Sequence, residues 1–188
     1  MTTSVSVTRH LKSGHIVAAG VAGSAVEAGM VWRFGWSSAL PAFLYFGAVA
    51  CLVSATDLAA RRVPNRVILP AYLIGPALLL LASIGSGKWM APIRAGLAMA
   101  VVGGFFLALA LIFPSGMGMG DCKLAGIVGL YLGWMGWSEV ITGVLLGYLG
   151  AALVVVALRA VRSSVGRGGM PFAPFIAGGA LFAVLFVR

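Results

Sequence analysis

Acidic residues are scarce in this sequence: four Asp and Glu side chains stand against thirteen Lys and Arg in 188 residues, a formal net charge of +9. All charged residues together make up 9% of the chain, whereas an average soluble domain has about 25%. A basic excess in a soluble protein would suggest nucleic-acid binding, but no basic face with interleaved aromatics runs through this sequence. The scarcity of charge argues against an ordinary soluble domain and against nucleic acid as a partner.

Residues that bind metals are equally few. Cys51 and Cys122 form no metal or redox motif and are expected to be structural thiols. His10 and His15 lie apart from any cluster of carboxylates or thiols, which argues against a zinc protease. The glycine-rich segments lack the spacing of a phosphate-binding loop or a dinucleotide fingerprint. We therefore expect neither a metal nor a cofactor.

Long apolar runs are abundant instead. Hydrophobic residues make up 61% of the chain, and the mean hydropathy is +1.08. A membrane-spanning helix needs about 17–25 mostly apolar residues. Runs close to this length occur at residues 38–55, 67–83, 91–113, 124–137, 140–158 and 172–187, of which the fourth is short and glycine-rich. The sequence predicts an all-α fold, a polytopic transmembrane bundle of six helices.

The first 37 residues form a separate N-terminal extension in this interpretation, followed by one transmembrane domain over residues 38–188. The extension is apolar, but its small residues and Glu27 weaken it as a membrane span. Three alternatives are open: a seventh transmembrane helix, a surface helix, or upstream sequence before a start at Met30. We favour the seventh helix, because it would put Arg9 and Lys12 on the cytoplasmic side.

Lys and Arg in the connecting loops set the orientation of a membrane protein. The loops after the first, third and fifth runs hold seven of them: Arg61, Arg62, Arg66, Lys123, Arg159, Arg162 and Arg167. The opposite side holds four: Arg33, Lys88, Arg94 and Arg188. The bias predicts a multi-pass protein of the inner membrane, with Asp57 and Asp121 at its cytoplasmic face.

Asp57 and Asp121 are the candidate catalytic residues. Ionisable groups near the membrane core are costly and point to function. If the two helices pack side by side, the two carboxyl groups will share a proton. One carboxylate can then activate a water molecule as a general base, while the other donates a proton to a carbonyl oxygen. This arrangement suits hydrolysis of a peptide bond.

Structural alternatives exist for each acidic residue. Asp57 and Arg61 are four residues apart, a spacing that favours an ion pair on a helix. Asp121 can cap the N-terminus of the fourth helix. Glu139 is expected in a solvated loop on the far side. The presence of both aspartates on one face of the membrane favours catalysis for the pair.

Glycines have two expected roles. Gly118 and Gly120, next to Asp121, let a substrate backbone approach closely because they lack a side chain. Small residues at helical spacing in the fourth and fifth runs let helices pack tightly in lipid. These packing glycines are Gly126, Gly129, Gly133, Gly143 and Gly147.

Three segments carry a family resemblance. "DLAARRVPN" (57–65) resembles the first-aspartate motif of the type IV prepilin peptidases, with Pro64 and Asn65 at its end. "GMGMGDCKL" (116–124) is similar to the second motif of that family, glycine-any-glycine-Asp followed by a lysine, here Lys123. "MPFAPFIAGGAL" (170–181) resembles a late Pro-Phe-Gly-Pro segment with Ala173 in place of the usual glycine, a segment that is not catalytic in the family.

The resemblance implies a membrane-embedded aspartic endopeptidase that removes the leader peptide of type IV prepilins at the cytoplasmic face, with Asp57 and Asp121 as the catalytic pair. Pro64, Asn65, Gly118, Gly120 and Lys123 are then residues that shape the substrate site and its loops, and Lys123 is expected first of all to hold the loop.

Longer members of the family carry an N-terminal domain, usually with Cys-x-x-Cys pairs, that is linked to N-methylation of the new pilin terminus. This sequence has no such pairs, so it resembles the short, peptidase-only form found in tight-adherence (Flp-type) pilus systems or in archaeal-like relatives. S-adenosylmethionine dependence is not implied. The expected partners are a prepilin and the lipid bilayer, with homo-oligomer formation open. The alternative function is a transporter or channel subunit whose aspartates are proton or cation sites.

Overall fold

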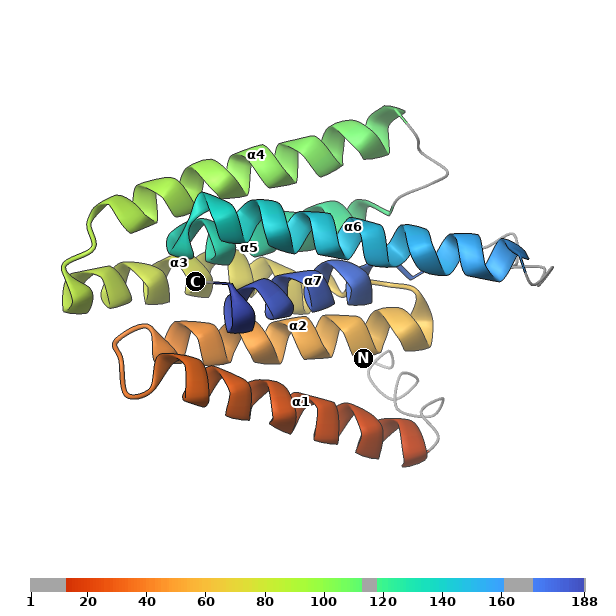
Figure 1. The fold of residues 1–188 in the computed structure, drawn as a ribbon, viewed down its shortest axis with the longest axis horizontal. Coiled ribbons are helices and arrows are strands. Elements are labelled where there is room, and N and C mark those ends of the chain that lie inside the picture. Colours follow the sequence, from red (N-terminus) through yellow and green to blue (C-terminus); the bar gives the residue numbers. More distant parts are fainter. Residues whose placement is uncertain (1–12, 113–117, 161–170, 188) are drawn as a thin grey trace, which may run out of the picture.

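The computed structural model describes residues 13–112, 118–160 and 171–187 (Figure 1). These residues form seven helices and no strand, which confirms the prediction of an all-α bundle. The helices are α1 (Ser13–Phe34), α2 (Leu40–Ala60), α3 (Asn65–Ser86), α4 (Met90–Ile112), α5 (Met119–Met135), α6 (Trp137–Ala160) and α7 (Ala173–Phe186).

Successive helices run in opposite directions and lie roughly parallel to one long axis (Figure 1). α5 is the central helix: it contacts α3, α4, α6 and α7, and its largest interface is with α4. α6 and α7 form a second closely packed pair, and α1 covers the outer side of α2. The C-terminal end of α2 and the N-terminal ends of α5 and α7 therefore lie at the same end of the bundle (Figure 1).

Four helices are long and apolar enough to cross a membrane: Leu40–Ala60, Asn65–Ser86, Met90–Ile112 and Trp137–Ala157. α7 is a shorter apolar helix, and α5, with 17 residues, is buried from Asp121 to Trp134 except for Lys123. All six runs expected to span the membrane thus form helices, but α5 is enclosed by the other helices. The extension also forms a helix, α1, which is not among the four candidate spans, so its crossing of the membrane stays a prediction.

Glycines allow the closest helix contacts, as the sequence predicts. A Cβ atom at Gly129 of α5 would lie 2.5 Å from the Ala98 carbonyl oxygen of α4, and a Cβ at Gly103 would lie 3.2 Å from the Cα of Gly126. In the other pair, Gly179 of α7 contacts the backbone of α6 directly. Because lipid offers no hydrophobic force between helices, such close backbone packing is a main source of their association.

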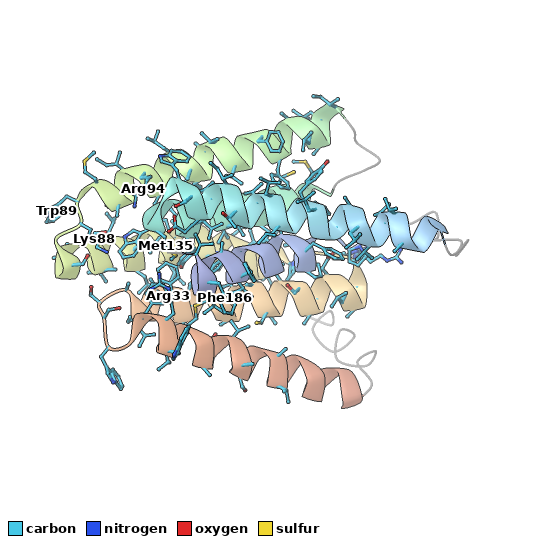
Figure 2. The ribbon with its side chains drawn as sticks, in the orientation of Figure 1. Arg33, Lys88, Trp89, Arg94, Met135 and Phe186 are labelled. Atoms are coloured by element: carbon cyan, nitrogen blue, oxygen red, sulfur yellow. The ribbon has the colours of Figure 1, made fainter. Side chains whose placement is uncertain are left out.

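Arg94 of α4 closes the end of α5 that lies farthest from the aspartates (Figure 2). Its guanidinium donates hydrogen bonds to the carbonyl oxygens of Gly133, Trp134 and Met135 at 2.6, 2.7 and 2.8 Å. The last carbonyl groups of a helix have no partner within the helix. Arg94 therefore supplies hydrogen-bond partners for the partly buried C-terminal carbonyls of α5.

Glu139 is not a solvated loop residue, so that expectation is wrong. It lies in the first turn of α6 and is 7% exposed, and the Ser138 hydroxyl donates to its carboxylate at 2.8 Å. Only Gly136 separates α5 from α6, so the chain has no loop at this point. The first turn of a helix also favours a negative charge.

Neighbouring glycines on α7 provide a test of the close packing. A Cβ at Gly179 would contact the backbone of Gly143 and Gly147, whereas nothing lies within 4 Å of a Cβ at Gly178. Gly179→Ala should lower the free energy of unfolding by about 1–3 kcal/mol, the usual cost of overpacking. Gly178→Ala should instead raise it by about 0.5–1 kcal/mol, because alanine has the higher helix propensity. Unfolding in detergent micelles, followed by circular dichroism, measures both; equal effects of the two substitutions would contradict the packing argument.

Candidate active site

Asp57 lies in the last turn of α2 and is 5% exposed. α2 ends three residues later because Arg61 adopts a left-handed conformation, with φ of 50°, and its N–H donates to the Asp57 carbonyl oxygen at 2.8 Å. The Oδ2 atom of Asp57 accepts a hydrogen bond from the N–H of Ala173 at 3.2 Å. Arg61 lies near enough for its charge to act on the Asp57 carboxyl group, but it does so from the left-handed C-cap position and not as a helical residue four positions on.

Asp121 lies in the first turn of α5 and is 8% exposed. Its Oδ2 atom accepts a hydrogen bond from the N–H of Gly118 at 3.2 Å, and its own N–H donates to the Gly118 carbonyl oxygen at 3.0 Å. The bond from the Gly118 N–H to the Asp121 carboxylate corresponds to the backward half of a capping box, in which the side chain of the third helical residue reaches back to the N-cap. Asp121 therefore does cap α5, from inside the first turn, with one of its two carboxylate oxygens.

The two carboxyl groups lie close enough to interact. Asp121 precedes the apolar part of α5 and lies outside the four candidate spans. Its burial, and after that the negative charge of Asp57, raise the pKa of Asp121 to about 6, although the Gly118 N–H acts in the opposite direction. Burial and a nearby like charge both disfavour the ionised form of a carboxyl group. The fold thus brings together two residues that are far apart in the sequence.

The two sequence motifs are in direct contact. A Cβ at Gly120 would lie 2.7 Å from the Cβ of Val63, so only glycine lets the α2–α3 connection pack here without a shift. The Lys123 ammonium donates a hydrogen bond to the Asn65 side-chain oxygen at 2.9 Å. Pro64 is the N-cap of α3 and has an extended conformation, which directs the chain into that contact. This contact joins the two motifs, and the role of Lys123 in holding the loop, the first of its expected roles, stays a prediction.

Two residues at the site were missed by the sequence analysis. The Tyr72 hydroxyl of α3 donates to the Lys123 carbonyl oxygen at 2.7 Å, two residues after Asp121. A tyrosine in an apolar span was a usable signal, because a buried hydroxyl usually has a hydrogen-bond partner. Ala173 acts through its backbone N–H, which no residue type reveals.

The fold and the site define a class: a multi-pass helical membrane protein with two buried carboxyl groups at one end of its bundle. The family model described as type IV leader peptidase family matches residues 43–161, a range that contains both aspartates. The chain belongs to this family.

Curated relatives agree with that assignment. A prepilin leader peptidase/N-methyltransferase from Bacillus subtilis (strain 168) is 34% identical over 156 residues, which cover 82% of this chain and 59% of the relative. Proteins of the same name from Pseudomonas putida and Burkholderia pseudomallei (strain K96243) are 30% and 32% identical, covering 84% and 88% of this chain and 54% and 53% of the relatives. The chain spans little more than half of their length. No solved structure matches it significantly.

The contact between Lys123 and Asn65 can be measured by a double-mutant cycle. Lys123→Met and Asn65→Ala should each lower the free energy of unfolding, and the double variant should lose less than the sum, with a coupling of about 0.5–1 kcal/mol for a partly exposed hydrogen bond. Lys88→Met, at the opposite end of the bundle, is the control and should show no coupling to Asn65→Ala. Strict additivity of the first pair would mean that the contact does not stabilise the protein.

Proposed function

We propose that this protein is an aspartic endopeptidase that removes the leader peptide of type IV prepilins. The observation that carries the proposal is the meeting of Asp57 and Asp121, the only aspartates in the chain, as buried and interacting carboxyl groups at one end of the bundle. The names of the curated relatives support the substrate class. A Flp-type prepilin as the particular substrate stays a prediction.

The environment of each carboxyl group suggests its role in hydrolysis. Asp121, whose pKa is raised to about 6, is the better holder of the shared proton. Asp57 then takes a proton from a water molecule, whose oxygen attacks the scissile carbonyl carbon while Asp121 protonates the carbonyl oxygen. When the intermediate collapses, the C–N bond breaks. Asp57 passes its proton to the leaving nitrogen, and Asp121 recovers a proton from a hydroxyl group of the intermediate.

We place this end of the bundle at the cytoplasmic face of the inner membrane. The described basic residues at this end are Arg61, Arg62, Arg66, Lys123 and, in the last turn of α6, Arg159. At the opposite end, Arg94 binds the last carbonyls of α5, the Arg33 guanidinium donates to the Val187 carbonyl oxygen at 3.5 Å, and the Lys88 ammonium lies 5.4 Å from the ring centroid of Trp134. Those three cations have structural partners, so they weigh less against the positive-inside bias.

Exposed tryptophans mark the opposite end of the bundle as a membrane boundary. Four tryptophans that are at least 45% exposed occur in or beside the connections at the end opposite the aspartates: Trp32, Trp36, Trp89 and Trp137. Figure 2 shows one of them, Trp89, at the tip of the α3–α4 connection. Tryptophan is enriched where the membrane meets water. These residues therefore mark that end of the bundle as a membrane–water boundary.

Substitution of the aspartates tests the proposal directly. Asp57→Asn and Asp121→Asn should each lower cleavage of prepilin peptides in detergent or lipid by about 10²–10⁴-fold, because each removes a group that transfers protons. Glu139→Gln is the matched control, since Glu139 is also a buried acid but lies at the far end of the bundle. It should cleave at the rate of the unchanged protein.

The outcomes of this experiment separate the candidate functions. Normal cleavage by either aspartate variant would disprove the catalytic pair. If the unchanged protein cleaves no Flp-type or other type IV prepilin peptide, a transporter or channel subunit becomes the better interpretation, and ion flux in proteoliposomes is the measurement to make. Comparison of the two peptide classes also tests the expected preference for Flp-type prepilins.

The shared proton predicts a characteristic pH dependence. As the pH rises through the pKa of Asp121, about 6, both carboxyl groups become ionised and the proton donor is lost. The value of kcat/KM should therefore fall on the alkaline side, approaching about tenfold per pH unit well above that pKa. A series of kcat/KM values with a peptide that does not itself titrate measures this. A rate that keeps rising from pH 5 to pH 8 would contradict the assignment of Asp121 as proton donor.

A further inference from the structure

The first turn of α7 has a single backbone donor that is available to another helix. Phe172 is the N-cap of α7, and Ala173, Pro174 and Phe175 follow it. The Phe175 N–H donates to the Phe172 carbonyl oxygen at 3.1 Å, and proline has no N–H. The Ala173 N–H remains, and it donates to the Asp57 carboxylate at 3.2 Å. A backbone N–H of the segment that resembles the late family motif thus binds a candidate catalytic residue.

The position of this donor is fixed by neighbouring helices. The Phe172 ring lies 6.2 Å from the ring of Phe106 in α4 and 6.1 Å from the ring of Tyr148 in α6, measured between centroids. α7 also packs against α2 and α5, the two helices that carry the aspartates. Ala173 itself is fully buried, so a larger side chain would push the N-terminus of α7 away from Asp57.

The contact also changes the electrostatic environment of the Asp57 carboxylate. Asp57 lies in the last turn of α2, where the negative end of the helix dipole disfavours a carboxylate. The N-terminus of α7 brings the positive end of a second dipole, together with an N–H group, to the same carboxylate. A carboxylate that accepts a directed hydrogen bond is also restricted in its rotation.

We propose that the N-terminus of α7 is a positioning element of the active site, which orients Asp57 through the N–H of Ala173. The inference rests on the proposed function, because it assumes that Asp57 takes part in hydrolysis. Pro174 contributes to this positioning element, because proline has no N–H that could compete with the Ala173 N–H for the carboxylate. Ala173 is a positioning residue: it acts through Asp57 and does not itself react.

Deletion of one N–H group tests this without a change of side chain. Replacement of Ala173 by lactic acid, introduced by nonsense suppression, converts the amide into an ester. This removes the donor and also weakens the Phe172 carbonyl as an acceptor for the Phe175 and Ile176 N–H groups, an effect that the control below shares in part. The kcat for a prepilin peptide should fall on the order of tenfold or more, the value of a hydrogen bond to a charged group, with KM changed by less than about twofold.

The matched control removes the next N–H in the same turn. Replacement of Phe175 by phenyllactic acid deletes the bond to the Phe172 carbonyl, so it weakens α7 to a similar degree but leaves the donor to Asp57 in place. It should lower thermal stability as much as the Ala173 ester does and leave kcat unchanged. Equal losses of kcat for the two esters would mean that α7 has only a structural role, and would overturn the proposal.

A spectroscopic measurement separates this inference from the proposed function. Because the chain has only two aspartates, ¹³C-aspartate in an Asp121→Asn background labels the carboxylate of Asp57 alone. The Ala173 ester should shift the infrared stretching band of that carboxylate, whereas the Phe175 ester should not. If the unchanged protein cleaves no prepilin, the proposed function fails but the band still reports the contact. An unshifted band would overturn the inference even if prepilins are cleaved.

Discussion

The backbone groups at both ends of α5 have to find hydrogen-bond partners inside the bundle, and the rest of the structure depends on this constraint. A helix that lies in lipid or among other helices has no water to satisfy its terminal N–H and C=O groups. Arg94 supplies three donors at the C-terminal end, and Asp121 supplies an acceptor at the N-terminal end. The central helix can therefore be short and almost fully buried. Its glycines allow α4 to approach closely.

The carboxylates of Asp121 and Asp57 are held by the same kind of hydrogen bond, but the donors come from different helices. Each carboxylate has one oxygen, Oδ2, that accepts a backbone N–H at a helix N-terminus. For Asp121 the helix is its own, whereas for Asp57 it is α7, which follows more than a hundred residues later in the chain. The capping role of Asp121 and its proposed catalytic role are therefore compatible: the cap holds the carboxyl group in place, and its burial beside Asp57 favours the protonated form.

The positions of the helices and of the acidic pair could be predicted from local features. Apolar runs define α2, α3, α4 and α6 to within a few residues because membrane-spanning helices must be apolar over most of their length. The two motifs at 57–65 and 116–124 resemble those of a known family closely enough to identify Asp57, Asp121, Asn65 and Lys123 as candidate site residues. Glu139 was placed wrongly because the length of the α5–α6 connection could not be read from the sequence. Tyr72 was missed because its role depends on a carbonyl group of another helix.

By itself, the sequence determined that the chain is a helical membrane protein, which residues form its spans, and which two carboxylates are candidates for catalysis. These properties follow from hydropathy and residue type, which act locally along the chain. Only the tertiary structure decided that α5 is enclosed at the centre, that Lys123 binds Asn65, and that the N-terminus of α7 reaches Asp57. Such contacts depend on backbone groups and on the packing of distant helices, and a backbone N–H is the same in almost every residue.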